Sequence, residues 1–154
     1  MESFERGYAD EHPRLLGTLL LITGVLDQAA EGVDEGFARA LERWNRVSSM
    51  DSPTGWVFTV AHNHVRRLQR RRALERRLLL RRPIAAHVPA PAGEIWHLVA
   101  DLPPRQREVV VLRHVGDFRE GEIAQVLGIS RSTVSSTLSD AHNRLGHLIH
   151  DEKA

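Results

Sequence analysis

Apolar residues recur along most of this chain at the spacing of one face of an α-helix, and no useful length alternates as a strand would. Proline and glycine positions divide the pattern into seven helices. These span about residues 4–24, 27–46, 53–80, 94–101, 104–115, 119–127 and 130–149. The predicted fold class is therefore all-α.

Residues 83–93 read PIAAHVPAPAG, with three prolines and no helical period. Such a composition is typical of a linker. The sequence therefore predicts two small helical domains, 1–82 and 94–154, joined by this Pro-rich segment.

Two of the predicted helices, separated by a tight turn, form a helix-turn-helix. Ile123 and Leu127 lie on one apolar face, and Gly128 can adopt the left-handed conformation that ends a helix. Ser130 can then cap a second helix, whose buried stripe consists of Val134, Leu138, Ala141 and Leu145. Its other side carries small hydroxyl and basic residues that suit a DNA major groove: Arg131, Ser132, Thr133, Ser135, Ser136, Ser139 and Arg144. The alternative is an ordinary helical hairpin with a Ser-rich solvent face.

Charge is unevenly distributed, although the net charge of the 154 residues is only +1. Residues 52–82 contain nine arginines against Glu75 alone, a local net charge of +8. Such a segment favours a phosphate-bearing partner, and the alternative is a solvated, Arg-rich helix end.

The chain has no cysteine, which excludes disulfides and fits the cytoplasm. The apolar run 15–26 is too interrupted for a signal peptide or a membrane span.

The predicted helix at 53–80 places Trp56, Val60 and Ala61 inward and leaves polar and basic residues for single-stranded DNA. Cationic and amide side chains can hold unstacked bases and their phosphates. The candidates are His62, Asn63, Arg66, Arg67, Arg70 and Arg71.

Residues 102–148 read LPPRQREVVVLRHVGDFREGEIAQVLGISRSTVSSTLSDAHNRLGHL, which resembles the fourth conserved region of bacterial RNA polymerase sigma factors. The segments HPRLLGTLLLITG, DQAAEGVDEGFARALERWNRV and SPTGWVFTVAHNHVRRLQRRR resemble, more weakly, the second region of the extracytoplasmic-function class. The resemblance implies that the second domain binds the minus-thirty-five promoter element. It also implies that the first binds the minus-ten element and core polymerase.

The helix predicted at 27–46 resembles the polymerase-binding helix of that class. Phe37, Leu41 and Trp44 share one face, and charged residues form the outer face. The resemblance assigns polymerase binding to Asp34, Glu35, Phe37, Arg39 and Trp44. The alternative for Phe37 and Trp44 is that they fill the core.

Two departures from the family pattern stand out. Gly32 and Gly36 lie inside the polymerase-binding helix and cost about 1 kcal/mol each relative to alanine, which predicts a softer helix. The recognition helix has Ser135, Thr137, Asp140 and His142 where family members commonly have basic residues. Arg131 and Arg144 are the only permanent cations between Ser130 and Leu145, which predicts weak DNA binding by the second domain alone.

The leading hypothesis is a non-enzymatic sigma factor whose partners are core RNA polymerase and promoter DNA, with an anti-sigma protein as a further expected partner and no membrane. One alternative is a sigma-like adaptor that does not read promoters, and another is a dimeric repressor. No cofactor and no metal site is predicted. His62 and His64 point to different helix faces, and His147 with Asp151 has metal-ligand spacing at a fraying end where capping is the simpler interpretation.

Overall fold

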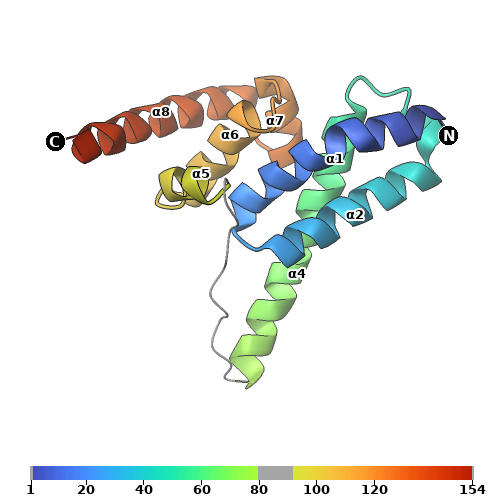
Figure 1. Ribbon diagram of the computed structural model, residues 1–154, viewed down its shortest axis with the longest axis horizontal. Helices are drawn as coiled ribbons and strands as arrows, with labels where there is room; N and C mark the ends of the chain where they lie inside the picture. The colour runs from blue at the N-terminus through green and yellow to red at the C-terminus, as the bar shows by residue number, and fades with distance from the viewer. Residues whose placement is uncertain (1, 80–91, 154) are drawn as a thin grey trace.

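The structure is a computed structural model that describes residues 2–79 and 92–153, which form helices and short connections (Figure 1). The helices are α1 (Glu2–Thr23), α2 (Leu26–Glu42), α3 (Trp44–Val47), α4 (Pro53–Leu79), α5 (Ala92–Val99), α6 (Pro104–His114), α7 (Glu120–Leu127) and α8 (Arg131–Lys153). The all-α prediction is confirmed, and most predicted helix bounds lie within about two residues of the observed ones.

Two sequence predictions differ from the observed elements. The single helix expected at 27–46 is interrupted at Arg43, whose backbone N–H donates to Ala40 O at 3.2 Å, three residues back, so that α2 tightens and ends. Most of the linker predicted at 83–93 lies outside the described residues. Its last two residues, Ala92 and Gly93, belong to α5.

Helices α1, α2 and α4 pack around a shared apolar core, with α1 and α2 side by side and α4 crossing them (Figure 1). Leu15, Leu19, Val33, Phe58 and Val65 are each at most 1% exposed. The apolar stripe of each helix faces the other two, as an amphipathic pattern requires. The C-terminal part of α4 extends beyond this bundle.

Gly32 and Gly36, one turn apart on α2, allow α4 to approach closely. A Cβ atom at Gly36 would lie 2.7 Å from the carbonyl oxygen of Val57, and one at Gly32 would lie 2.7 Å from Val65 Cγ2. Both distances are far shorter than van der Waals contact. The two glycines are therefore a requirement of helix packing, and their cost to helix propensity is offset by the close contact that they permit.

Gly36→Ala is expected to lower the free energy of unfolding by about 1–3 kcal/mol, because the new methyl group collides with the α4 backbone. Gly17→Ala is the matched control, because nothing lies within 4 Å of a Cβ at Gly17 in α1. It should raise stability by up to about 1 kcal/mol through helix propensity. Urea unfolding of both variants, followed by circular dichroism, measures the difference. Equal stabilisation by the two substitutions would contradict the close helix contact.

Helices α7 and α8 form the predicted helix-turn-helix, supported by α6. Gly128 has φ +66°, and the Ser130 Oγ accepts a hydrogen bond from the Thr133 backbone N–H at 3.1 Å. The glycine turn and the serine cap are therefore both confirmed. Val109, Ile123 and Val134, each fully buried, hold the three helices together.

The two halves of the chain share one hydrophobic core. α1 packs against α5 and α6, and α4 packs against α7. The rings of Phe58 and Phe118 lie 5.5 Å apart between centroids, and the Trp96 ring lies directly against Gly24, which has φ +71°. Helical periodicity did not indicate this contact, because it shows which face of a helix is apolar but not which distant helix covers it.

Candidate nucleic-acid interface

The first four turns of α8 present an exposed polar face. All seven residues proposed from the sequence for duplex DNA are exposed: Arg131, Ser132, Thr133, Ser135, Ser136, Ser139 and Arg144. Val134, Leu138 and Ala141, on the opposite side, are buried. The face is therefore accessible, and its small side chains would let the helix enter a major groove.

Hydrogen bonds within the helix-turn-helix bring a carboxylate to this face. The Ser135 hydroxyl donates to Glu120 Oε2 at 2.9 Å, and the Ser136 hydroxyl donates to the Thr133 carbonyl at 3.2 Å. Glu120 begins α7 and was not identified from the sequence, although the start of the first helix of this motif lies beside the second. A carboxylate accepts hydrogen bonds from base amino groups but repels phosphates, so it reduces the non-specific affinity of an already weakly basic face.

A second basic surface runs along α4. Asn63, Arg66, Arg67, Arg70 and Arg71 are all exposed, as the sequence predicted. Within the described residues, no carboxylate oxygen lies within 4.0 Å of a guanidinium nitrogen of these arginines. They therefore form no direct ion pair there, although the charges of Arg66 and Arg67 act on the nearby carboxylates of Glu108 and Glu35. The exposed positive charge along this side of α4 favours a phosphate-bearing partner.

His62, proposed with these residues, is 5% exposed and does not lie with them in this arrangement. Its Nε2 lies 3.4 Å from Glu108 Oε2 of α6, and its ring stacks on Phe58. In this arrangement α6 covers that part of α4 and leaves His62 inaccessible to an unstacked base, so its role in binding single-stranded DNA stays a prediction. Burial raises the pKa of the Glu108 carboxyl, but contact with His62 and the nearby charge of Arg105 outweigh burial and leave the pKa below its ordinary value.

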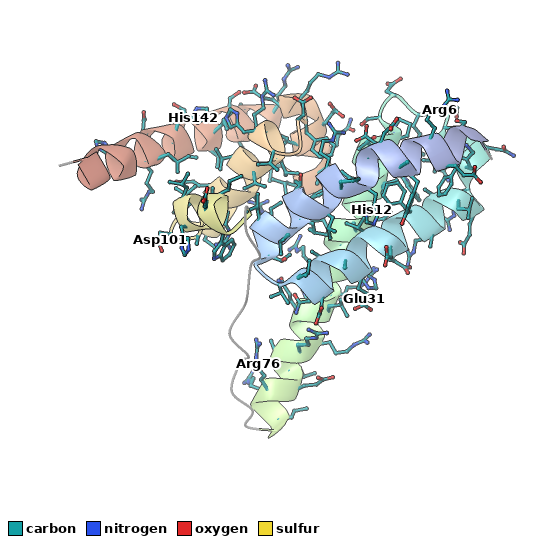
Figure 2. The ribbon with its side chains drawn as sticks, viewed as in Figure 1. Arg6, His12, Glu31, Arg76, Asp101 and His142 are labelled. Carbon is teal, nitrogen blue, oxygen red and sulfur yellow. The ribbon has the colours of Figure 1, made fainter. Side chains whose placement is uncertain are left out.

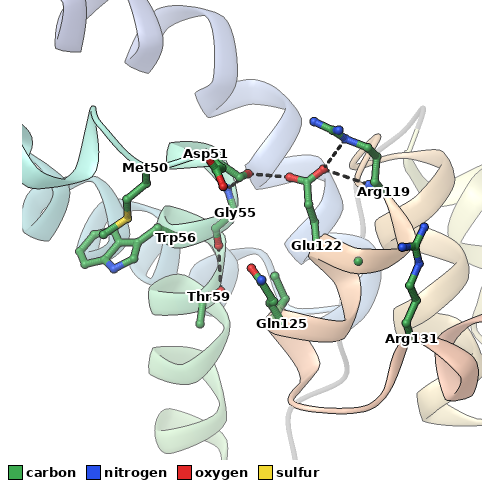
Figure 3. Close-up of a pocket in the computed structure, with 12 residues that line it drawn as sticks. Met50, Asp51, Gly55, Trp56, Thr59, Arg119, Glu122, Gln125 and Arg131 are labelled. Carbon is green, nitrogen blue, oxygen red and sulfur yellow. Dashed lines mark hydrogen bonds and ion pairs between the residues drawn. The ribbon is translucent and has the colours of Figure 1, made fainter.

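A groove of about 670 Å³ lies between the start of α4 and α7 (Figure 3). Glu122 Oε2 accepts from the Ser52 hydroxyl at 2.6 Å, and Ser52 Oγ accepts from the Gly55 backbone N–H at 3.0 Å and caps α4. Glu122 Oε1 accepts from the backbone N–H and the Nε of Arg119 at 3.2 and 3.3 Å. Burial raises the pKa of Glu122, but these hydrogen bonds outweigh it and lower the pKa below its ordinary value. One carboxylate thus ties α7 to the start of α4.

The free energy of unfolding of this arrangement, in which Glu122 joins α7 to the start of α4, is expected to fall in acid. A carboxyl whose pKa is lowered by folding stabilises the folded state above its ordinary pKa of 4.5, and that contribution disappears as the pH falls through its folded-state pKa. Glu122→Gln should therefore flatten the decline in the free energy of unfolding below about pH 4.5. Glu42→Gln, at an exposed position of α2, is the control and should keep the wild-type slope. An unchanged slope in the Glu122 variant would refute this role.

On α2, the charged residues proposed for polymerase binding are accessible. Asp34 and Arg39 are exposed, and the Arg39 Nε donates to Glu35 Oε1 at 2.7 Å across one turn. The hydrogen bond from Arg39 lowers the pKa of the half-buried Glu35. These side chains form an ordered charged patch that a partner can contact.

The two aromatic residues proposed for polymerase binding are packed against α1. Phe37 is 7% exposed, and the centroid of its ring lies 4.9 Å from that of Tyr8. Trp44 is half-buried, and the centroid of its ring lies 5.3 Å from that of Phe4. Leu41, expected on the same inward face, is instead 44% exposed. The structure therefore places Phe37 in the core and leaves Leu41 accessible, as it does Leu26 at the start of this helix.

Among the described residues, no group of three or more His, Asp or Glu side chains could hold a metal ion. His114 Nε2 and His142 Nε2 lie 2.8 Å apart, and burial, followed by the charges of His142 and Arg113, lowers the pKa of His114. His147 is exposed, and the Asp151 side chain proposed beside it lies outside the described residues.

None of the described helices has the length and apolar character that a membrane span needs.

A helix-turn-helix in one half and an exposed basic helix in the other are typical of the class of proteins that bind nucleic acid. Residues 8–75 match the family model of Sigma-70 region 2, and residues 92–145 match that of Sigma-70, region 4. The chain therefore belongs to the sigma-70 family, in its extracytoplasmic-function class, and is a promoter-recognising sigma factor.

Solved structures show the same fold. The sigma factor RpoE in complex with the anti-sigma factor NepR, from Bartonella quintana, is similar over 97% of this chain and 98% of its own, with a TM-score of 0.82 and 20% identity. CnrH in complex with the cytosolic domain of CnrY is similar over 97% of this chain and 89% of its own, with a TM-score of 0.68 and 21% identity. A comparison with curated protein sequences found no match.

Proposed function

We propose that this sigma factor holds promoter DNA through two surfaces, the start of α8 and the arginine side of α4, and holds core polymerase through α2. The observation that carries the proposal is the set of exposed α4 arginines, which form no ion pair with any carboxylate that the structure describes. Their charge fits the phosphates of a melted strand, and Asn63 beside them can bond to an exposed base. The chain contributes binding energy and no catalytic group.

In this proposal the half that contains α6 and α7 must separate from the half that contains α4 before the whole α4 surface can bind single-stranded DNA. Glu108 and α6 cover His62, and Glu122 ties α7 to the start of α4. His62 can reach single-stranded DNA when these contacts open. The domains proposed from the sequence, 1–82 and 94–154, would then engage the minus-ten and minus-thirty-five elements separately.

An anti-sigma protein is the third partner that we propose. The two solved structures described above were determined as complexes, one with an anti-sigma factor and one with the cytosolic domain of CnrY. The exposed Leu74 and Leu78 on the projecting part of α4, 55% and 72% exposed, offer apolar surface for such a partner.

An adaptor that binds polymerase without reading promoters is the second candidate. Glu120 beside Ser135 favours it, because a carboxylate on the recognition face weakens contact with phosphates. The two candidates differ in whether α8 contacts DNA in the complex with polymerase.

Arg131→Ala tests the α8 surface directly. Loss of one contact to DNA should cost about 1–3 kcal/mol of promoter affinity, measured by fluorescence anisotropy with the complex of core polymerase and this chain. Arg6→Ala, at an exposed arginine of α1, is the control and should bind promoter DNA as the wild type does. If the Arg131→Ala complex also binds promoter DNA like the wild type, α8 does not read DNA, and the adaptor becomes the favoured function.

A further inference from the structure

His114 and His142 bring two imidazole rings together between α6 and α8. His114 is the last residue of α6, and His142 lies in the middle of α8 (Figure 2). Their ring centroids lie 5.0 Å apart and their Nε2 atoms 2.8 Å apart. Both residues are exposed, and their two nitrogens lie at hydrogen-bonding distance, so an ion bound by both would replace that hydrogen bond.

The separation of the two nitrogens favours particular metal ions. With metal–nitrogen bonds of 2.0–2.1 Å, two nitrogens 2.8 Å apart subtend an angle of about 86° at the metal. This angle is close to that of neighbouring positions in square-planar or octahedral coordination, the geometries of Cu²⁺ and Ni²⁺. Tetrahedral Zn²⁺ would need the nitrogens about 3.3 Å apart. Water or another oxygen ligand would complete the coordination.

The pair lies on the side of α8 that faces DNA in the proposed function. His142 follows Ser135 by seven residues, which is 20° short of two helical turns and about 10.5 Å along the helix axis. This stretch of the helix has Arg131 and Arg144 as its permanent cations, and Glu120 adds a negative charge beside Ser135. A divalent ion would supply the positive charge that this face lacks.

We propose that His114 and His142 form a two-ligand site for Cu²⁺ or Ni²⁺, and that the bound ion strengthens the contact of α8 with DNA. The first part stands on the geometry of the two rings. The second part rests on the proposed function, because it requires α8 to face promoter DNA.

Isothermal titration of the untagged full chain with NiCl₂ tests the site. The wild type should bind one ion per chain, and His114→Ala and His142→Ala should each weaken binding by about 100-fold, because a two-ligand chelate becomes a single ligand. His147→Ala, which removes another exposed imidazole of α8, should bind as the wild type does. Absence of binding to the wild type, or equal weakening by His147→Ala, would overturn the site.

The consequence for DNA is measured separately by fluorescence anisotropy with a promoter duplex and the complex of core polymerase and this chain. NiCl₂ should increase the affinity of complexes with the wild type and with His147→Ala but not with His142→Ala, and MgCl₂ at the same concentration should not reproduce the difference. If calorimetry shows the site while Ni²⁺ leaves DNA affinity unchanged, the second part of the proposal is wrong. If the complex binds no promoter at any metal concentration, the proposed function fails, while calorimetry still decides the site.

Discussion

A short cross-link between positions 52 and 122 is expected to abolish promoter opening by this sigma factor. Ser52 Oγ and Glu122 Oε2 lie 2.6 Å apart across the contact between the two halves, so a link there holds α7 against the start of α4. With the halves held together, Glu108 continues to cover His62. The two promoter elements could not then be engaged by separated halves.

The absence of cysteine from the chain makes this experiment specific. Ser52→Cys and Glu122→Cys introduce the only two thiols, which a short thiol-reactive linker that reducing agents cleave can join. Transcription should be lost on cross-linking and recovered after cleavage, and each single variant treated with the linker should stay active. Full activity of the linked protein would show that promoter opening does not require the halves to separate.

Alanine at Arg66, Arg67, Arg70 and Arg71 together is expected to prevent formation of the open promoter complex. Each of these exposed arginines can neutralise one phosphate of the melted strand. Binding to single strands weakens with salt by a slope of about 0.7 per phosphate contact, so removing four contacts should reduce the slope by about 2.8. Permanganate footprinting measures strand opening, and a salt titration measures the slope.

Arg72, Arg76 and Arg77 lie farther along α4 and provide the matched control, because they too are exposed. Their triple alanine variant removes almost as much charge but leaves the proposed binding surface intact, so strand opening should persist. Equal loss in the two variants would mean that α4 acts through its overall charge. Strand opening by the quadruple variant would contradict the assignment of the minus-ten element to this surface.

The parts of the fold that depend on neighbouring residues were predictable from the sequence. The helix-turn-helix is defined within a few residues by Gly128, which ends α7, and Ser130, which caps α8, and both behave as expected. The exposure of the α4 arginines also followed from local sequence, although the predicted inward face was only partly right. Ala61 is buried as expected, whereas Trp56 and Val60 are half-buried and Val57, Phe58 and Val65 form the rest of the buried stripe.

The features that the sequence did not reveal depend on contacts between distant residues. His62 looks accessible on an isolated helix and becomes buried because Glu108, 46 positions later, packs over it. From the sequence, Gly32 and Gly36 only weaken the helix that contains them, and their role in the close packing of α4 against α2 requires the folded structure. Glu120 joins the recognition face only through the folded turn. Periodicity within one helix contains no information about these partners.

Run-off transcription with purified core polymerase tests the central claim most directly. A library of genomic fragments is transcribed with and without the chain, and the start sites are mapped. A promoter-recognising sigma factor should produce new, discrete start sites that disappear with the quadruple arginine variant. If the chain co-purifies with core polymerase and yet no new start site appears on any fragment, it does not direct promoter recognition, and the central claim is contradicted.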